Sequence, residues 1–86
     1  MKETGEIELL FEEDADHTLA RASLVLRGVT FTGAGRARRN PTDTNMPIVG
    51  EELAASRALS DLAHKLLDAA AEVVSGAEGV PVHLRG

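Results

Sequence analysis

The sequence predicts an α+β domain in which a three-stranded antiparallel meander packs on one long C-terminal helix. Apolar and polar residues alternate between Glu6 and Glu12, which is typical of a half-buried strand. Two further strand-like runs follow and are joined near Arg27-Gly28. After Gly50, apolar residues recur at helical spacing through most of the remaining chain. These three observations give the element order β-β-β-α.

The first strand is expected over residues 6–12, with two chemically different faces. The apolar face carries Ile7, Leu9 and Phe11, and the opposite face carries Glu6, Glu8, Leu10 and Glu12. Asp14-Ala-Asp-His17 then supplies residues that favour a turn.

The second and third strands are expected from about Thr18 to Leu26 and from about Val29 to Arg38. A two-residue turn between them places apolar or small residues opposite one another on one face: Leu26 with Val29, Leu24 with Phe31, Ala22 with Gly33, and Ala20 with Gly35. A slip of one residue would mix the two faces, so the pattern specifies this register. The small residues at one end leave room for a helix to approach closely.

The helix is expected to begin near Gly50 or Glu51 and to stop at Gly76. Asp61 and Lys65 lie four residues apart, in the order that favours an ion pair. The stripe expected to be buried consists of Ala55, Leu59, Leu62, Leu66, Ala69, Ala70 and Val73.

Prolines and glycines mark the boundaries of this domain. Pro41 and Pro47 predict a loop over residues 40–50. A chain of 86 residues has room for one modest core, and we expect a single domain over residues 1–75. The tail over residues 76–86 is expected to be flexible or to add a short strand.

Composition and charge argue against several classes of protein. The net charge of −5 is unfavourable for general binding to nucleic acid or anionic membranes. No cysteine is present, which excludes disulfides and thiolate zinc sites. No apolar leader or membrane-length apolar run occurs, so we expect a cytoplasmic protein that does not enter a membrane.

Three segments carry a resemblance to a known family: Gly33-Ala-Gly-Arg-Ala-Arg-Arg-Asn-Pro-Thr-Asp43, Pro47-Ile-Val-Gly-Glu-Glu-Leu-Ala-Ala55, and Ala58-Leu-Ser-Asp-Leu-Ala-His-Lys-Leu-Leu67. With them the chain resembles the small actinobacterial proteins of the family called domain of unknown function 1876, up to about Val74. The resemblance implies a fold like the double-stranded-RNA-binding domain without its first helix, and no established activity. RNA-binding members of that superfamily carry lysines at the start of the last helix. Here that position reads Gly50-Glu51-Glu52-Leu53, so the resemblance suggests the scaffold and counts against the activity.

The first candidate site is the basic run Arg36, Arg38 and Arg39, together with Arg21. Arg36 and Arg38 alternate with Ala37, so both are expected on the outer face of the sheet, where they could contact phosphate or an acidic partner. The alternative is that these arginines only keep an edge strand soluble. Acids of the first strand share this face, and Arg21 is expected to lie nearer to them than Arg36 or Arg38.

Other patterns are weak evidence for chemistry. Gly33-Ala-Gly35 lacks the third glycine of a phosphate-binding fingerprint. Ser60, Asp61 and His64 share one helical turn without the pocket that a nucleophile and base require. The acidic turn over residues 12–17 has no calcium-loop spacing. We therefore assign no catalytic, cofactor-binding or metal-binding residue and expect no enzyme activity.

The function that the sequence favours is a small interaction module that binds a protein partner or associates with itself as a homodimer. The outer face of the sheet and the edge of the third strand, including Arg36–Arg39, are the expected surfaces, and the third strand could pair with its symmetry mate. Leu10, Val25 and the loop residues 46–49 add apolar material for a partner. The alternative is weak binding of RNA through the arginine edge.

Overall fold

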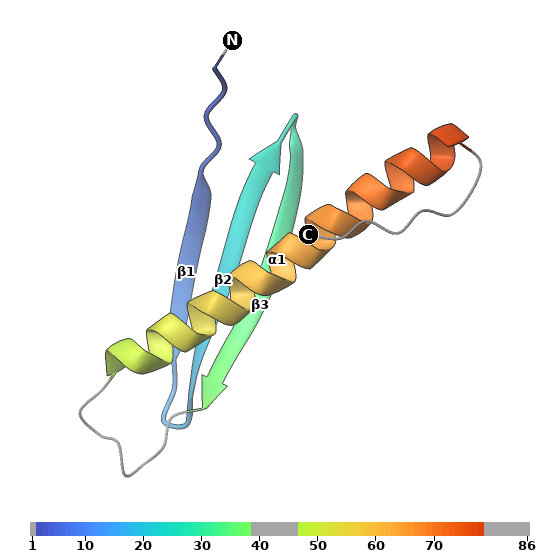
Figure 1. Ribbon diagram of the computed structural model, residues 1–86. Coiled ribbons are helices and arrows are strands. Elements are labelled where there is room, and N and C mark those ends of the chain that lie inside the picture. The colour runs from blue at the N-terminus through green and yellow to red at the C-terminus, as the bar shows by residue number, and fades with distance from the viewer. Residues whose placement is uncertain (1, 39–46, 79–86) are drawn as a thin grey trace.

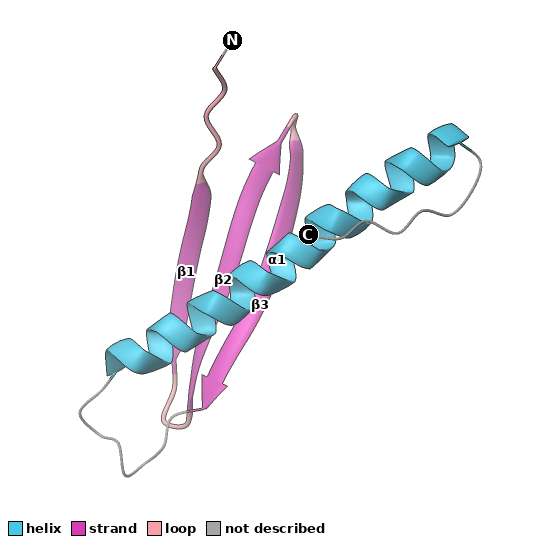
Figure 2. Ribbon diagram, in the orientation of Figure 1, coloured by secondary structure: helices cyan, strands magenta, loops and turns pink. Residues whose placement is uncertain are grey.

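A computed structural model of the chain describes residues 2–38 and 47–78. Three strands, β1 (Ile7–Glu13), β2 (His17–Leu26) and β3 (Val29–Arg38), precede one long helix, α1 (Pro47–Glu78). The strands form an antiparallel sheet in the order β1-β2-β3, with α1 packed across one face of it (Figures 1 and 2). The predicted α+β fold is confirmed. We call the face that α1 covers the helix face and the opposite one the outer face.

The β2–β3 hairpin has the register that the sequence predicts. All four predicted pairs on the helix face are present, from Leu26 with Val29 to Ala20 with Gly35. The turn residues Arg27 and Gly28 both have positive φ angles, 52° and 78°. Two such residues form the type of tight turn whose twist matches that of the flanking strands. The sorting of apolar and polar faces therefore determines the register, although arginine is a poor residue for this turn.

The β1–β2 connection is held by a carboxylate. Oδ1 of Asp14 accepts hydrogen bonds from the backbone N–H groups of Asp16 and His17, at 2.8 and 2.7 Å. These two bonds favour the ionised carboxylate and lower its pKa. β1 then pairs with β2 so that Ile7, Leu9 and Phe11 lie on the helix face, as predicted.

The close approach of helix and sheet occurs at two glycines of β3. A Cβ atom added at Gly33 would collide with the backbone of Ala58 and Leu62, lying 2.9 Å from Cα of Leu62. One added at Gly35 would collide with the backbone of Ala54 and Ala58. Only residues without a side chain fit at these two positions, which confirms the prediction that small residues make room for the helix.

The buried stripe of α1 differs from the predicted one by one position in its first half. Ala54, Ala58 and Leu62 form the core with alanines of β2 and β3, and Leu66 packs against it. The predicted members Ala55 and Leu59 are only partly covered, and Val73 is 72% exposed. The physical reason is the short distance between helix and sheet, which favours the small side chains of Ala54 and Ala58 where the helix backbone meets Gly35 and Gly33.

Both predicted helix boundaries are also corrected. The helix begins at Pro47 rather than near Gly50, because proline fits the first helical position, where its missing N–H has no intrahelical partner. Residues 47–50 are therefore helical and not loop, and Glu51 and Glu52 lie beyond the first turn. The helix also continues through Gly76 to Glu78. The predicted loop over residues 40–46, Arg39, and the tail from residue 79 lie outside the described residues.

The helix crosses the sheet diagonally and is much longer than the region it covers. It packs against β3 and β2, and its C-terminal half continues past β3 (Figure 1). All seven residues of β1 are exposed. The two edges of this small sheet are therefore in different environments.

Candidate interaction site at the edge of the sheet

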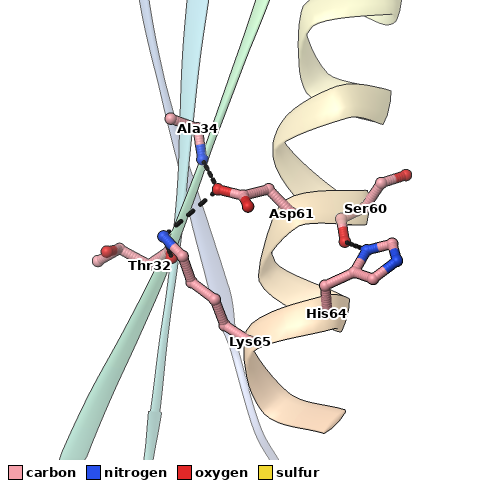
Figure 3. Close-up of polar contacts among 6 residues, drawn as sticks. All are labelled: Thr32, Ala34, Ser60, Asp61, His64 and Lys65. Atoms are coloured by element: carbon pink, nitrogen blue, oxygen red, sulfur yellow. Dashed lines mark hydrogen bonds and ion pairs between the residues drawn. The ribbon is translucent and has the colours of Figure 1, made fainter. Parts of the chain in front are cut away.

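Three side chains of α1 bind the outer edge of β3, which we call the β3 edge. Nη1 of Arg57 donates to the carbonyl of Arg36 at 2.6 Å, and Nζ of Lys65 donates to the carbonyl of Thr32 at 2.8 Å. Between them, Oδ2 of Asp61 accepts from the N–H of Ala34 at 2.9 Å (Figure 3). Residues spaced by four on one helix thus satisfy backbone groups spaced by two on one strand.

Asp61 and Lys65 also bind each other. Nζ of Lys65 lies 3.3 Å from Oδ2 of Asp61, which confirms the predicted pairing. The hydrogen bond from the N–H of Ala34, and next the one from Lys65, lower the pKa of the Asp61 carboxyl below its usual value. The ionised form of Asp61 is therefore coupled to the docking of the helix on β3.

The pairing of β3 with its symmetry mate stays a prediction, and the contacts of α1 over Thr32–Arg36 count against it. A second strand would have to displace Arg57, Asp61 and Lys65 from the backbone groups that it needs. The sequence showed Asp61 and Lys65 as a pair, but the role of Arg57 was missed. The sequence pattern that could have indicated this role is the spacing of three charged residues, Arg57, Asp61 and Lys65, by four. They flank the buried residues Ala54, Ala58 and Leu62.

The opposite edge, formed by β1, is open; we call it the β1 edge. Within residues 2–38 and 47–78, no side chain of α1 hydrogen-bonds to the backbone of β1. On the helix face of β1, Ile7 is 49%, Leu9 37% and Phe11 41% exposed. Leu10 is exposed on the outer face. The result is an edge strand, paired on one side with β2, that presents apolar side chains on both faces.

The backbone groups that β1 offers follow from the ladder. Thr32, Ala34 and Arg36 point their groups away from β2, so the residues between them bond to β2. The residues of β2 and β1 alternate in the same way between their two neighbouring edges. It follows that Glu8, Leu10 and Glu12 are the residues of β1 whose backbone groups hydrogen-bond to β2. The N–H and C=O groups of Ile7, Leu9 and Phe11 consequently face the open edge. The same residues supply the exposed apolar side chains on the helix face.

The predicted arginine site lies on the outer face. Arg21, Arg36 and Arg38 are all exposed there, and Arg39 is outside the described residues. Arg21 lies next to the acids of β1, because its partner Leu10 is between Glu8 and Glu12. Arg36 is one strand further away, because Leu19 of β2 lies between it and Glu12. A shallow hollow between β1 and β3 is lined by Leu10, Glu12, Leu19, Ala20, Arg21, Ala34 and Gly35. The outer face is therefore acidic along β1 and basic towards the end of β3.

Ser60 and His64 do not form a nucleophile–base pair. Nδ1 of His64 donates to the backbone carbonyl of Ser60 at 2.8 Å, and the hydroxyl of Ser60 points away from the ring (Figure 3). The ring nitrogen that faces Ser60 is thus bonded to a carbonyl rather than to the hydroxyl. In the part of the chain that the structure describes, no three His, Asp or Glu side chains are grouped as metal ligands.

Over residues 47–78, α1 lacks the long uncharged apolar stretch that a membrane span needs.

Together these features define a class of small α+β protein: a three-stranded meander whose one edge is bound by its own helix and whose other edge is open within residues 2–38 and 47–78. The chain belongs to the Rv2632c-like family, whose model matches residues 3–83.

Relatives and a solved structure agree with this assignment. The uncharacterized protein Rv2632c of Mycobacterium tuberculosis is 38% identical over 79 residues, covering 92% of this chain and 85% of its own length. The uncharacterized protein Mb1767 of Mycobacterium bovis is 35% identical over 78 residues, covering 91% and 83%. The crystal structure of Rv2632c superposes with a TM-score of 0.85 at 36% identity, covering 94% of this chain and 96% of that one. The fold is therefore shared with an experimentally determined relative.

Proposed function

We propose that this protein is a non-enzymatic interaction module that binds a protein strand along its β1 edge. The observation that carries the proposal is the contrast between the bound β3 edge and the open β1 edge. In strand addition, backbone hydrogen bonds provide affinity and alternate side chains provide specificity. Ile7, Leu9 and Phe11 offer both, because their backbone groups face the edge and their side chains are half-exposed.

The experiment that tests this proposal removes one edge N–H group. Leu9→Pro eliminates an N–H that points away from β2, so the β1–β2 ladder keeps its own hydrogen bonds. Thr30→Pro makes the same chemical change at the end of β3 that α1 leaves open, and serves as the matched control. Circular dichroism should show that both variants fold.

Affinity capture from extracts of the source cells then compares three baits: the natural chain, Leu9→Pro and Thr30→Pro. We expect proteins that are recovered with the natural chain and with Thr30→Pro and lost with Leu9→Pro. The natural chain is a bait for its own copies as well, so self-association is read in the same experiment. Equal recovery with all three folded baits would contradict strand addition at β1.

A location in the cytoplasm is part of this proposal. The absence of cysteine suits a reducing compartment.

The second candidate is weak RNA binding through the outer face, supported by the placement of Arg21, Arg36 and Arg38 on that face. It rests on the resemblance to the double-stranded-RNA-binding fold, and the exposed acids Glu51 and Glu52 near the helix start count against it. Fluorescence anisotropy with an RNA duplex of about 16 base pairs, at increasing salt, tests it. Binding that weakens with salt and disappears in Arg36→Glu/Arg38→Glu would favour this function.

A further inference from the structure

We infer that the partner at the β1 edge is a second copy of this chain, bound by antiparallel pairing of the two β1 strands about a two-fold axis at Leu9. The two sheets then form one six-stranded sheet, three strands from each copy, with both helices on the same face. This inference rests on the proposed strand addition at β1 and names its occupant.

The apolar pattern of β1 is symmetric about Leu9. In this register Ile7 lies opposite Phe11 of the second copy, and Leu9 lies opposite Leu9. All three pairs on the helix face are then apolar, and each joins residues whose backbone groups face the edge. Pairs of this kind exchange two hydrogen bonds each, so about six backbone bonds join the copies.

Neighbouring registers are less favourable. An axis at Leu10 would place Glu8 opposite Glu12 and Ile7 opposite Glu13. An axis at Glu8 would place Glu8 opposite itself and Phe11 opposite Gly5. Like charges directly across a strand pair destabilise it. The Leu9 register places Glu8 opposite Leu10 and has a like-charge pair of its own, Glu6 opposite Glu12. It differs from its neighbours in that Ile7, Leu9 and Phe11 all lie opposite apolar residues on the helix face.

The start of α1 supports a second copy rather than an isolated peptide. In Figure 1 the first turn of α1 extends beyond β1 on the side away from β2, toward the end of the sheet where the β1–β2 turn lies. The two-fold operation brings the partner's first turn to the other end of β1, where Ile7 is exposed. Val49, in that first turn, is itself 45% exposed. An isolated peptide strand would leave both side chains uncovered.

The charges of β1 predict an unusual salt dependence for this dimer. The strands of both copies carry Glu6, Glu8, Glu12 and Glu13, and association brings these like charges together. Salt screens that repulsion, so higher salt should strengthen the dimer severalfold. RNA binding has the opposite dependence.

Cross-linking tests the register without background, because the chain has no cysteine of its own. Leu9→Cys places two thiols opposite each other at the axis, within the separation that a disulfide requires. We expect it to form a covalent dimer on mild oxidation. Leu10→Cys, one residue along and also exposed, should not link to itself, but should link to Glu8→Cys when the two variants are mixed. Linking of Leu10→Cys to itself, with none at Leu9→Cys, would overturn the register.

Light scattering during size-exclusion chromatography tests the association. The natural chain and Thr30→Pro should show about twice the 9.1 kDa mass of one chain at high concentration, and Leu9→Pro should show a single chain. A monomer at every concentration and salt overturns the inference. In that case a captured protein that depends on Leu9 still supports strand addition. A dimer that Leu9→Pro does not weaken overturns the inference, and with no Leu9-dependent partner it overturns the proposed function too.

Discussion

The β3 edge and the β1 edge belong to the same small sheet, yet the chain treats them differently. At the β3 edge, Arg57, Asp61 and Lys65 bind backbone groups that would otherwise be open to another strand. At the β1 edge, Ile7, Leu9 and Phe11 keep their edge groups open and their side chains half-exposed. Since open edges promote pairing with other chains, this difference between the edges is what supports the proposed strand addition at β1.

The difference has a geometric cause in the glycines of β3. Gly33 and Gly35 let the helix backbone lie close to β3, which brings the flanking polar residues of the helix within hydrogen-bond distance of the strand edge. β1 is two strands away and has side chains at every position.

The largest effect is expected from filling the space at Gly33. Gly33→Ala puts a Cβ atom into the backbone of Ala58 and Leu62 and forces the helix away from β3. We expect a loss of about 3 kcal/mol or more of unfolding free energy, measured by urea denaturation followed by circular dichroism. Ala34→Val, one residue along on the exposed outer face, is the control and should change stability by no more than about 0.5 kcal/mol. Equal effects of the two variants would contradict the close packing.

The second prediction compares leucines near the two edges. Leu62 is 2% exposed in the core beside β3, so Leu62→Ala should cost about 2–4 kcal/mol. Leu9 is 37% exposed on β1, and Leu9→Ala should cost less than about 1.5 kcal/mol in the monomer. Denaturation at low protein concentration keeps association from contributing. A larger cost at Leu9 would mean that β1 is as well packed as β3.

The third prediction concerns the loss of folding stability at acidic pH. The pKa of Asp61 is lowered in the folded protein, so its stabilising effect is complete above the ordinary pKa of 3.8 and is lost as the pH falls through the lowered value. Asp61→Asn should therefore lose less stability than the natural chain between neutral and strongly acidic pH. Asp68→Asn removes the same charge at another exposed position of α1 and should keep the natural acid dependence.

Hydrogen exchange gives a residue-level readout of the same contact. The N–H of Ala34 donates to Asp61, so it should exchange more slowly than the N–H of Leu9 in dilute monomer. Asp61→Ala should remove that difference, and Asp68→Ala should leave it. Equal exchange at the two positions in the natural chain would show that the β3 edge is not protected in solution.

The smallest effect on stability is expected at the β2–β3 turn, which lies away from the middle of either edge of the sheet. Arg27 has a positive φ angle that arginine adopts poorly and asparagine adopts well. Arg27→Asn should raise stability by about 0.5–1 kcal/mol without changing association. Gly28→Ala, at the second turn position, should lower it. A change in dimer mass with either variant would show that the turn takes part in the interface.

Much of the fold could be predicted because it depends on local patterns. The pairing of Leu24 with Phe31 and Ala22 with Gly33 follows from sorting side chains onto two faces, and the sequence contains that information directly. The start of the helix at Pro47 was missed because the proline was interpreted as a loop residue rather than as a helix-initiating one.

The candidate site could not be predicted in the same way. Which edge is open depends on the angle at which the helix crosses the sheet, and helical periodicity does not encode that angle. The sequence shows that Ile7, Leu9 and Phe11 form an apolar face. It does not show that α1 leaves these side chains half-exposed. Arg57 was missed because its partner, the carbonyl of Arg36, is a backbone group that carries no sequence signal.

The match between α1 and β3 also limits how much of an edge one helix can protect. Four residues of a helix advance about 6 Å, whereas two residues of a strand advance about 6.6 Å. The two repeats stay in step for the contacts from Arg57 to Lys65, and we expect the difference in advance and the diagonal crossing to separate them beyond this span. A straight helix therefore works as a short clamp on a ten-residue strand. We therefore expect that lengthening β3 would add backbone groups at its ends that α1 cannot reach.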